Sequence, residues 1–299
     1  MTSTNAALSS SSARLWLFIL QQRVKLSSIN VTRLRHRNLL NSASVVAPEG
    51  PVVSINSDGR NLDTVYLTLE SIAGGKVLPS RLILWVQDAE SFNNRPSSLI
   101  RLEDRGLEVR VVKDYNGESN NRTFASSLDN LRYPLVTASA DVLYNRNWLA
   151  GLVKAHQRNP QMLNCYSAHV VPVMHGKIGA YLTWQPCEST EPSFRHVATG
   201  ASGCIYPMEY LQQLQLSGSQ ALENFLSAND IWLHANALRA GFKVKQIGQL
   251  SKIFQFMTGI KPDELSGLKS DFRSVDENIK KTYIASDISL LSAAMESKK

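Results

Sequence analysis

The sequence predicts an α/β fold with a mostly parallel, doubly wound sheet. Between residues 50 and 160, short apolar runs alternate with amphipathic segments that carry apolar residues at helical spacing. Glycine and proline separate these segments at points where helices are expected to end. An alternation of strands and helices at this rhythm is typical of βαβ units, in which helices connect neighbouring parallel strands.

The first half of the chain contains the clearest elements. Residues 51–56 are expected to form the first strand, and residues 61–73 a helix that ends at the Gly74–Gly75 pair. Further strands are expected at 81–87, 107–113 and 135–139, and further helices at 97–105 and 147–158.

The pattern becomes less regular after Pro160. Residues 161–173 and 177–184 are expected to form longer, antiparallel strands, followed by helices at 219–227 and 230–240 and a strand at 242–247. Residues 261–299 are charged and helical in pattern, as in a peripheral tail. The chain therefore divides into an N-terminal arm over residues 1–49, a main domain over 50–260 and a tail over 261–299.

The positive charge of the chain is concentrated at its N-terminus. The formal net charge is +7, with 32 basic and 25 acidic residues, and the first acid is Glu49. Six basic residues precede Glu49, so 26 basic residues face 25 acids in the remainder, a net of +1. The charge therefore does not indicate a basic stripe on the main domain, and no nucleic-acid partner is expected.

The N-terminal arm has the composition of a membrane-surface segment. Residues 14–26 are predicted to form a short amphipathic helix, in which Trp16 and Phe18 lie beside basic residues. An anionic membrane surface would attract the basic residues between 14 and 37. The same pattern also fits a helix packed on the main domain, or a Ser-rich, acid-free transit peptide. No run of 18 apolar residues occurs, so no transmembrane helix is expected.

The chain has three cysteines, Cys165, Cys187 and Cys204. Their odd number and the lack of a CxxC pair do not fit a disulfide framework. Reduced thiols in a reducing compartment are expected, because the histidines nearby lack the spacing of a zinc site.

Polar residues follow two of the expected strands. Asn56 is followed by a polar turn that contains Asp58, and the strand at 135–139 ends at Ser139, two residues before Asp141. Doubly wound sheets bind ligands at the carboxyl ends of their strands, and an acid placed there suits a divalent cation held against a diphosphate. Plain surface turns are the alternative at both places. Neither GxGxxG nor GxxxxGK[ST] occurs, which argues against a dinucleotide dehydrogenase and a P-loop NTPase.

Two later segments also suggest a binding site. The small residues Gly200–Gly203 precede an apolar run, and small residues allow a backbone to approach a ligand closely. A tight turn is the alternative. Asp230 precedes the apolar Ile231–Leu233 at the start of an expected helix. It suits either a helix cap or a general base at the mouth of a pocket.

Taken in order, these segments resemble bacterial polysaccharide glycosyltransferases of the GT-A superfamily, of the family 2 type. Members of that group carry an "ESI" helix, a strand like "RIILWL", a "GLEI" strand, and "TADDDxxYPxxWLxxL", "tGxGGxLYP" and "DDIWL" blocks. The corresponding segments here are Glu70–Ile72, Arg81–Val86, Gly106–Val109, Thr137–Leu152, Thr199–Pro207 and Asn229–Leu233.

The resemblance implies a GT-A fold, a Rossmann-like α/β architecture with a central mixed sheet flanked by helices. It also implies a glycosyltransferase that uses a nucleotide-diphosphate sugar as donor and a glycan or lipid-linked acceptor, with inversion, in surface polysaccharide synthesis. Such an enzyme would work in the cytoplasm, at the inner face of the membrane. Asp141 is implied as the ligand of Mn²⁺ or Mg²⁺, and Asp230 as the base. Residues implied to bind the donor are Asn56, Asp58, Asp114, Arg122, Ser139, Gly200, Ser202, Gly203 and Trp184.

Within this set, Asp114 is a candidate for the nucleoside and Arg122 for a phosphate, because a guanidinium pairs well with phosphate oxygens. Tyr181 and Trp184 are candidates for apolar contact with a sugar.

The sequence departs from the resemblance at its acidic motifs. The DDD triplet of the relatives is Ser139-Ala140-Asp141 here, and the acidic pair before "IWL" is Asn229-Asp230. Three interpretations remain. The enzyme uses a metal with fewer protein ligands, or it works without metal and relies on arginines such as Arg122. The arginines considered for the metal-free enzyme are Arg122, Arg146 and Arg195. Alternatively, the chain is a catalytically degenerate relative that binds a nucleotide-sugar or a glycan, or serves as a scaffold.

Overall fold

The computed structural model describes residues 27–57, 61–86, 88–111, 132–216, 229–257 and 272–296. Several sequence predictions therefore lie outside the described residues: the helices at 14–26 and 219–227, and the site residues Asp58, Asp114 and Arg122.

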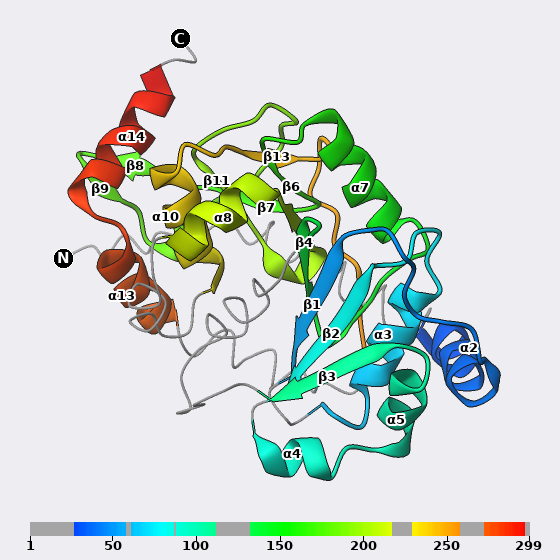
Figure 1. Ribbon diagram of the computed structural model, residues 1–299. Coiled ribbons are helices and arrows are strands. Elements are labelled where there is room, and N and C mark those ends of the chain that lie inside the picture. The colour runs from blue at the N-terminus through cyan, green and yellow to red at the C-terminus, as the bar shows by residue number, and fades with distance from the viewer. Residues whose placement is uncertain are drawn as a thin grey trace.

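The protein is built on a seven-stranded sheet with the order β13-β6-β12-β4-β1-β2-β3 (Figure 1). β12 pairs antiparallel with β4 and β6, and all other neighbours in the sheet are parallel. The strand bounds are β1 Val52–Asn56, β2 Arg81–Val86, β3 Leu107–Val111, β4 Leu135–Ser139, β6 Leu163–Cys165, β12 Cys204–Tyr206 and β13 Val244–Gln246. The predicted mostly parallel sheet is confirmed.

Helices cover both faces of the sheet, because alternate residues of each strand point to opposite sides. In β2, Leu82 and Leu84 join one apolar core, whereas Ile83 and Trp85 join another. The first core also contains residues of α3 (Val65–Ala73), α5 (Ser97–Glu103) and α7 (Trp148–Arg158). The second contains residues of α8 (Met208–Leu216) and α10 (Asn229–Arg239). A short helix, α4 (Ala89–Asn93), follows β2.

The second half of the chain differs from the long strands predicted at 161–173 and 177–184. Short strands and one 3-10 helix replace them, because Pro172 interrupts the first run and the chain turns back at Gly176, where φ is +68°. The short elements are β7 Ala168–Val170, β8 Val173–Met174, β9 Lys177–Ile178, η1 Tyr181–Thr183, β10 Gln185–Pro186, β11 His196–Ala198 and η2 Gly200–Ser202. A further pair, β5 (Val142–Leu143) and β14 (Gln255–Phe256), runs antiparallel.

Helix α8 was not predicted, although its sequence contained a usable signal. It begins directly after Pro207 and buries Tyr210, Leu211 and Leu214, which lie on one helical face. The apolar pattern covers only a few residues and lies between two segments that contain glycine, so it was not recognised as a helix.

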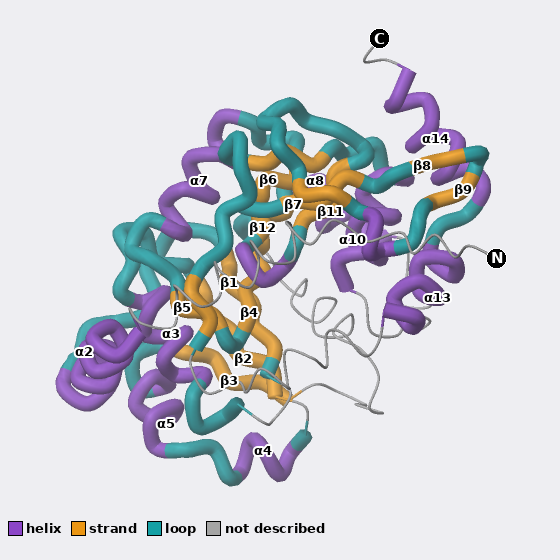
Figure 2. Tube along the Cα trace, turned by 180° about the vertical axis from the view of Figure 1, so that it is seen from behind, coloured by secondary structure: helices purple, strands orange, loops and turns teal. Residues whose placement is uncertain are grey.

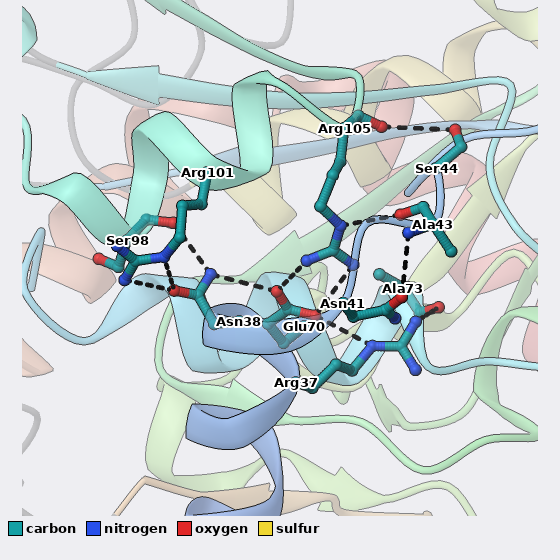
Figure 3. A network of polar contacts seen from close by, with 10 residues as sticks. All are labelled: Arg37, Asn38, Asn41, Ala43, Ser44, Glu70, Ala73, Ser98, Arg101 and Arg105. Carbon is teal, nitrogen blue, oxygen red and sulfur yellow. Dashed lines mark hydrogen bonds and ion pairs between the residues drawn. The ribbon is translucent and has the colours of Figure 1, made fainter.

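Part of the basic N-terminal arm is helical and packs on the main domain. Helix α2 (Ser27–Leu40) lies beside α3 and α5, where the fully buried carboxylate of Glu70 joins three elements (Figures 1 and 3). Glu70 accepts hydrogen bonds from Arg37 and Asn38 of α2, and from Arg105, which follows α5. A buried carboxylate requires such partners, so this network ties α2 to the sheet domain.

The C-terminal helices α13 (Phe272–Thr282) and α14 (Ala285–Glu296) pack against α10. Arg239 of α10 forms an ion pair with the buried Asp287 at 2.7 Å, and His234 Nδ1 lies 2.6 Å from the Tyr283 hydroxyl. Residues of the C-terminal helices, such as Tyr283 and Leu291, are therefore buried in an apolar core together with residues of α10. Among the described residues, no helix combines the length and apolar character needed to cross a bilayer.

Candidate functional site

The candidate site lies at the carboxyl ends of β1 and β4. These two central strands are parallel and in register, so that Asn56 and Ser139 are direct neighbours at their ends. Both side chains are partly buried. The sequence predicted both residues as donor-binding candidates, and the sheet brings them together because parallel strands end at the same edge.

The turn after β4 is held from two sides. Thr68 of α3 donates from Oγ1 to the carbonyl of Ala140 at 2.9 Å, and the amide of Met257 donates to the carbonyl of Asp141 at 2.8 Å. Within this turn, Ser139 Oγ donates a 2.5 Å hydrogen bond to Asp141 Oδ1. The hydroxyl and the carboxylate therefore form one cluster of oxygen atoms at the edge of the sheet.

Tyr144 connects the end of β4 to the Gly200–Gly203 segment. Its buried hydroxyl accepts a hydrogen bond from the amide of Ser139 at 2.9 Å and donates one to the carbonyl of Ala201 at 3.0 Å. Burial raises the pKa of this phenol well above its ordinary value, so it remains a donor. The sequence pattern alone did not assign a role to Tyr144. The feature that could have drawn attention to it is its position three residues after Asp141, the acid that follows the strand.

The glycines of the 200–203 segment allow two close approaches by protein side chains. A Cβ on Gly200 would lie 2.9 Å from Asp230 Oδ1, and a Cβ on Gly203 would lie 2.7 Å from Trp148 Nε1. Gly203 also has φ of +96°, a conformation that favours glycine. Trp148 Nε1 donates to the carbonyl of Ser202 at 3.0 Å. The small residues in this segment thus fit it tightly against α7 and α10.

Asp230 lies in the first turn of α10, beside this segment. Its Oδ2 accepts a 2.9 Å hydrogen bond from the amide of Gly200. The carboxylate is partly buried, and burial raises its pKa to about 6, although the Gly200 hydrogen bond acts in the opposite direction. Among the described residues, its carboxylate contacts an amide distant in sequence rather than capping its own helix. Asp230 therefore keeps a proton-accepting carboxylate near neutral pH.

Tyr181 lies within the electrostatic range of Asp230. The pKa of Tyr181 is raised by burial and, to a smaller extent, by the negative charge of Asp230. The Tyr181 and Trp184 rings lie 5.3 Å apart, centre to centre. Trp184 is only 5% exposed, and its Nε1 donates to the carbonyl of Gly179 at 3.0 Å. Tyr181 is partly buried and is therefore more exposed to solvent than Trp184.

Comparison with known proteins identifies the fold. No protein-family model and no curated protein matches the chain. Among solved structures, the crystal structure of GalNAc-T7 with UDP, GalNAc and Mn²⁺ matches with a TM-score of 0.51 at 12% identity, covering 70% of this chain and 44% of that one. The fold is of the GT-A type. This chain spans less than half the length of the GalNAc-T7 chain.

Two other structures are more weakly similar to this GT-A fold. The 1–349 portion of S. aureus TarS matches with a TM-score of 0.46 at 13% identity, covering 74% of this chain and 63% of that one. A CMP:2-keto-3-deoxy-manno-octonic acid synthetase complexed with CTP matches with a TM-score of 0.42 at 10% identity, covering 76% and 100%.

Asp141 is the acidic side chain that the turn after β4 offers to a metal ion. Among the described residues, no group of three or more His, Cys, Asp or Glu side chains is arranged to hold a metal ion. Asp141 and the neighbouring Ser139 offer one carboxylate and one hydroxyl. Mg²⁺ sites that rely on substrate phosphates use one or two carboxylates, so this pair fits an ion whose other ligands come from a diphosphate and water.

Proposed function

We propose that the chain is a glycosyltransferase that moves a sugar from a nucleotide-diphosphate sugar to a hydroxyl of a glycan or lipid-linked acceptor. The observation that carries the proposal is the carboxylate of Asp230, whose pKa is raised to about 6 and which contacts Gly200 at 2.9 Å. A chain of contacts through Gly200, Ala201 and Tyr144 connects it to the Ser139–Asp141 pair at the edge of the sheet.

In the proposed reaction, Asp230 accepts the proton of the acceptor hydroxyl. The hydroxyl oxygen forms a bond to the anomeric carbon of the donor, and the bond from that carbon to the diphosphate oxygen breaks. The nucleoside diphosphate leaves with the electron pair, and the configuration at the anomeric carbon inverts. A base is most effective when its pKa lies near the working pH, which suits a carboxylate with a pKa near 6.

The donor is proposed to bind along the ends of β1 and β4. Asn56 and Ser139 are neighbours there, and Gly200, Ser202 and Gly203 belong to the segment that connects this edge to Asp230. Asp141 would hold Mn²⁺ or Mg²⁺, an ion that stabilises the charge of a leaving diphosphate. Asp58, Asp114 and Arg122 remain proposals for the nucleoside and the phosphates.

Substitution of Asp230 by asparagine tests this function. Asp230→Asn keeps the shape of the side chain and removes its basicity, so turnover is expected to fall by about 10²–10⁴-fold. The measurement is release of nucleoside diphosphate from a panel of nucleotide-diphosphate sugars with saccharide acceptors. Asp104→Asn, at an exposed position after α5, is the matched control and should leave turnover unchanged. Full activity of a folded Asp230→Asn protein would exclude Asp230 as the base.

A non-catalytic binding protein is the second candidate. The observation that favours it is the hydroxyl of Ser139, which donates to Asp141 at the place where the resembling enzymes carry a further carboxylate. Thermal unfolding is measured with nucleotide-diphosphate sugars, each with EDTA and with Mn²⁺. A ligand that binds the native state raises the unfolding midpoint, so both the enzyme and the binding protein should show a rise, and a protein without a donor site should not. A raised midpoint without turnover by any donor and acceptor pair would favour the binding protein.

We also propose that the protein works in the cytoplasm at the inner face of a membrane, in surface polysaccharide synthesis. The support comes from the basic segment 14–37 and from α2, where Arg33 and Arg35 are exposed and Leu39 and Leu40 are 61% and 82% exposed. Sedimentation with phosphatidylglycerol vesicles tests this attachment. A protein that lacks residues 1–26 should bind less, and unchanged binding would remove these residues from the proposal.

A further inference from the structure

A cavity of about 440 Å³ lies between α2, α3 and the β5–β14 pair. Residues of α2, the end of α3, the segment 143–146 and the segment 252–255 line it. Figure 2 shows α2 and α3 on the same side of the molecule as β5. Neither Asp230 nor Asp141 belongs to its lining, but Tyr144, whose hydroxyl contacts Ser139 in the candidate functional site, does.

The lining of this cavity is strongly cationic. Arg33 and Arg37 of α2 reach it together with Arg146 and Lys252, and Glu70 is the acid that lines it. Four cations and one acid give the lining a net charge of +3. Glu70 is already engaged by Arg37 and Arg105.

Three of these cations have no acidic partner within the described part of the chain. No ion pair joins Arg33, Arg146 or Lys252 to a described carboxylate; Lys252 instead lies 5.2 Å from the Tyr166 and Phe254 ring centres. Like charges held around one cavity repel each other unless an anion compensates them. The arrangement therefore favours an anionic occupant.

One residue of the lining, Gln255, also carries an unsatisfied hydrogen-bond donor. The side-chain nitrogen Nε2 of Gln255 is buried and has no hydrogen-bond partner among the described residues. A buried donor without a partner costs about 1–3 kcal/mol, so native structures normally provide an acceptor. If the Gln255 amide turned towards the cavity, an anion oxygen there would accept a hydrogen bond from it.

We propose that this cavity is a binding site for a phosphate group. Arginine forks match phosphate oxygens and lysine supplies a further charge, so Arg33, Arg146 and Lys252 would neutralise the anion while Gln255 donates to it. The volume of about 440 Å³ lies in the usual range for small-molecule sites, so the phosphate can be part of a larger molecule. The proposal does not depend on glycosyl transfer.

Titration calorimetry of the full chain with inorganic phosphate and with pyrophosphate, at low ionic strength, tests the site. The cavity variant is Arg33→Gln, Arg146→Gln, Lys252→Gln; the substituted side chains are exposed, so the fold should persist. Loss of three charge-assisted contacts is expected to weaken binding by more than about tenfold. Arg37 stays unchanged because it holds Glu70.

The matched control is Arg35→Gln, Lys154→Gln, Arg158→Gln, which removes the same charge from exposed positions of α2 and α7 outside the cavity. Retained binding in the control with loss in the cavity variant supports the site. Equal weakening in both variants, or no binding by the unmodified protein, overturns it. Sedimentation with phosphatidylcholine vesicles, with and without phosphatidylglycerol, then shows whether the bound phosphate group belongs to a lipid or to a soluble molecule. Lipid binding that needs the cavity indicates a headgroup; cavity-dependent binding of soluble phosphate alone indicates a free phosphorylated molecule.

Discussion

The amide of Gly200 donates a 2.9 Å hydrogen bond to Oδ2 of Asp230, although 30 residues separate the two in sequence. The contact joins the 3-10 turn after β11 to the first turn of α10. Gly200 is partly buried and has no Cβ to keep the carboxylate away. The position of Asp230 therefore depends on a small residue in a different segment.

The activity should depend on pH through Asp230. Burial raises its pKa to about 6, so the proposed base becomes protonated as the pH falls below 6. We expect the acidic limb of the kcat/KM profile near pH 6 rather than near the ordinary value of 3.8. A limb near pH 4 would mean that Asp230 is not the titrating base.

The raised pKa of Asp230 should also make the stability of the fold depend on pH. Between about pH 4 and 6 the folded chain holds a proton on Asp230 that the unfolded chain has lost, so this group stabilises the fold less as the pH rises through that window. Comparison of unfolding midpoints between the unmodified protein and Asp230→Asn isolates the effect. The comparison cancels the opposite effect of His234, whose burial lowers its pKa to about 4.

Gly200→Ala should displace the Asp230 carboxylate. The new Cβ would lie 2.9 Å from Oδ1, closer than side chains normally approach, so the Asp230 carboxylate must shift. We expect overpacking to cost about 1–3 kcal/mol of unfolding free energy and to reduce turnover as well. Gly248→Ala is the control, since its Cβ would make only an ordinary 3.5 Å contact. Equal effects of the two substitutions would contradict this account.

Tyr144→Phe should loosen the connection between β4 and the 200–203 segment. The substitution removes the hydroxyl that bonds Ser139 and Ala201, at a cost of about 1–3 kcal/mol measured by denaturant unfolding. Tyr210→Phe is a matched control, because it removes a buried hydroxyl that donates to Leu233 on α10. Both variants should lose stability, but only Tyr144→Phe should weaken nucleotide-sugar binding. Unchanged donor binding would make Tyr144 purely structural.

Glu70→Gln should separate α2 from the domain. Removing the charge leaves Arg37 and the buried Arg105 without their carboxylate, which costs about 3–5 kcal/mol. The control is Glu103→Gln, which breaks the partly exposed pair with Arg95 and should cost no more than about 1 kcal/mol. Denaturant unfolding measures both. A small loss for Glu70→Gln would show that α2 is held mainly by apolar contacts.

Ser139→Asp tests the link between this position and metal binding. The substitution places a second carboxylate beside Asp141, and divalent ions bind more tightly to a site with more anionic oxygens. We expect Mn²⁺ to raise the unfolding midpoint with a nucleoside diphosphate more in this variant than in the unmodified protein. Ser139→Asn provides a control of similar size without charge. Equal responses of the two variants would place the metal elsewhere.

The sequence by itself determined that the chain forms a mostly parallel sheet, and where the central strands and helices lie along the chain. Strand periodicity with glycine and proline boundaries is local information, and β1, β2 and β4 lie at the predicted positions. Asn56, Ser139 and Asp141 were selected for the same reason, because residues at the ends of parallel strands share one edge. The resemblance carried the GT-A fold, which the comparison with solved structures confirmed.

Only the tertiary structure decided which distant side chains meet. The contact of Gly200 with Asp230, the clamp of Tyr144 and the buried Glu70 network each join segments more than 30 residues apart or in different elements. No local pattern marks such pairs, because the free energy that places them comes from burial in the assembled core. The same holds for the cavity beside α2, whose cations come from three segments that the sequence leaves far apart.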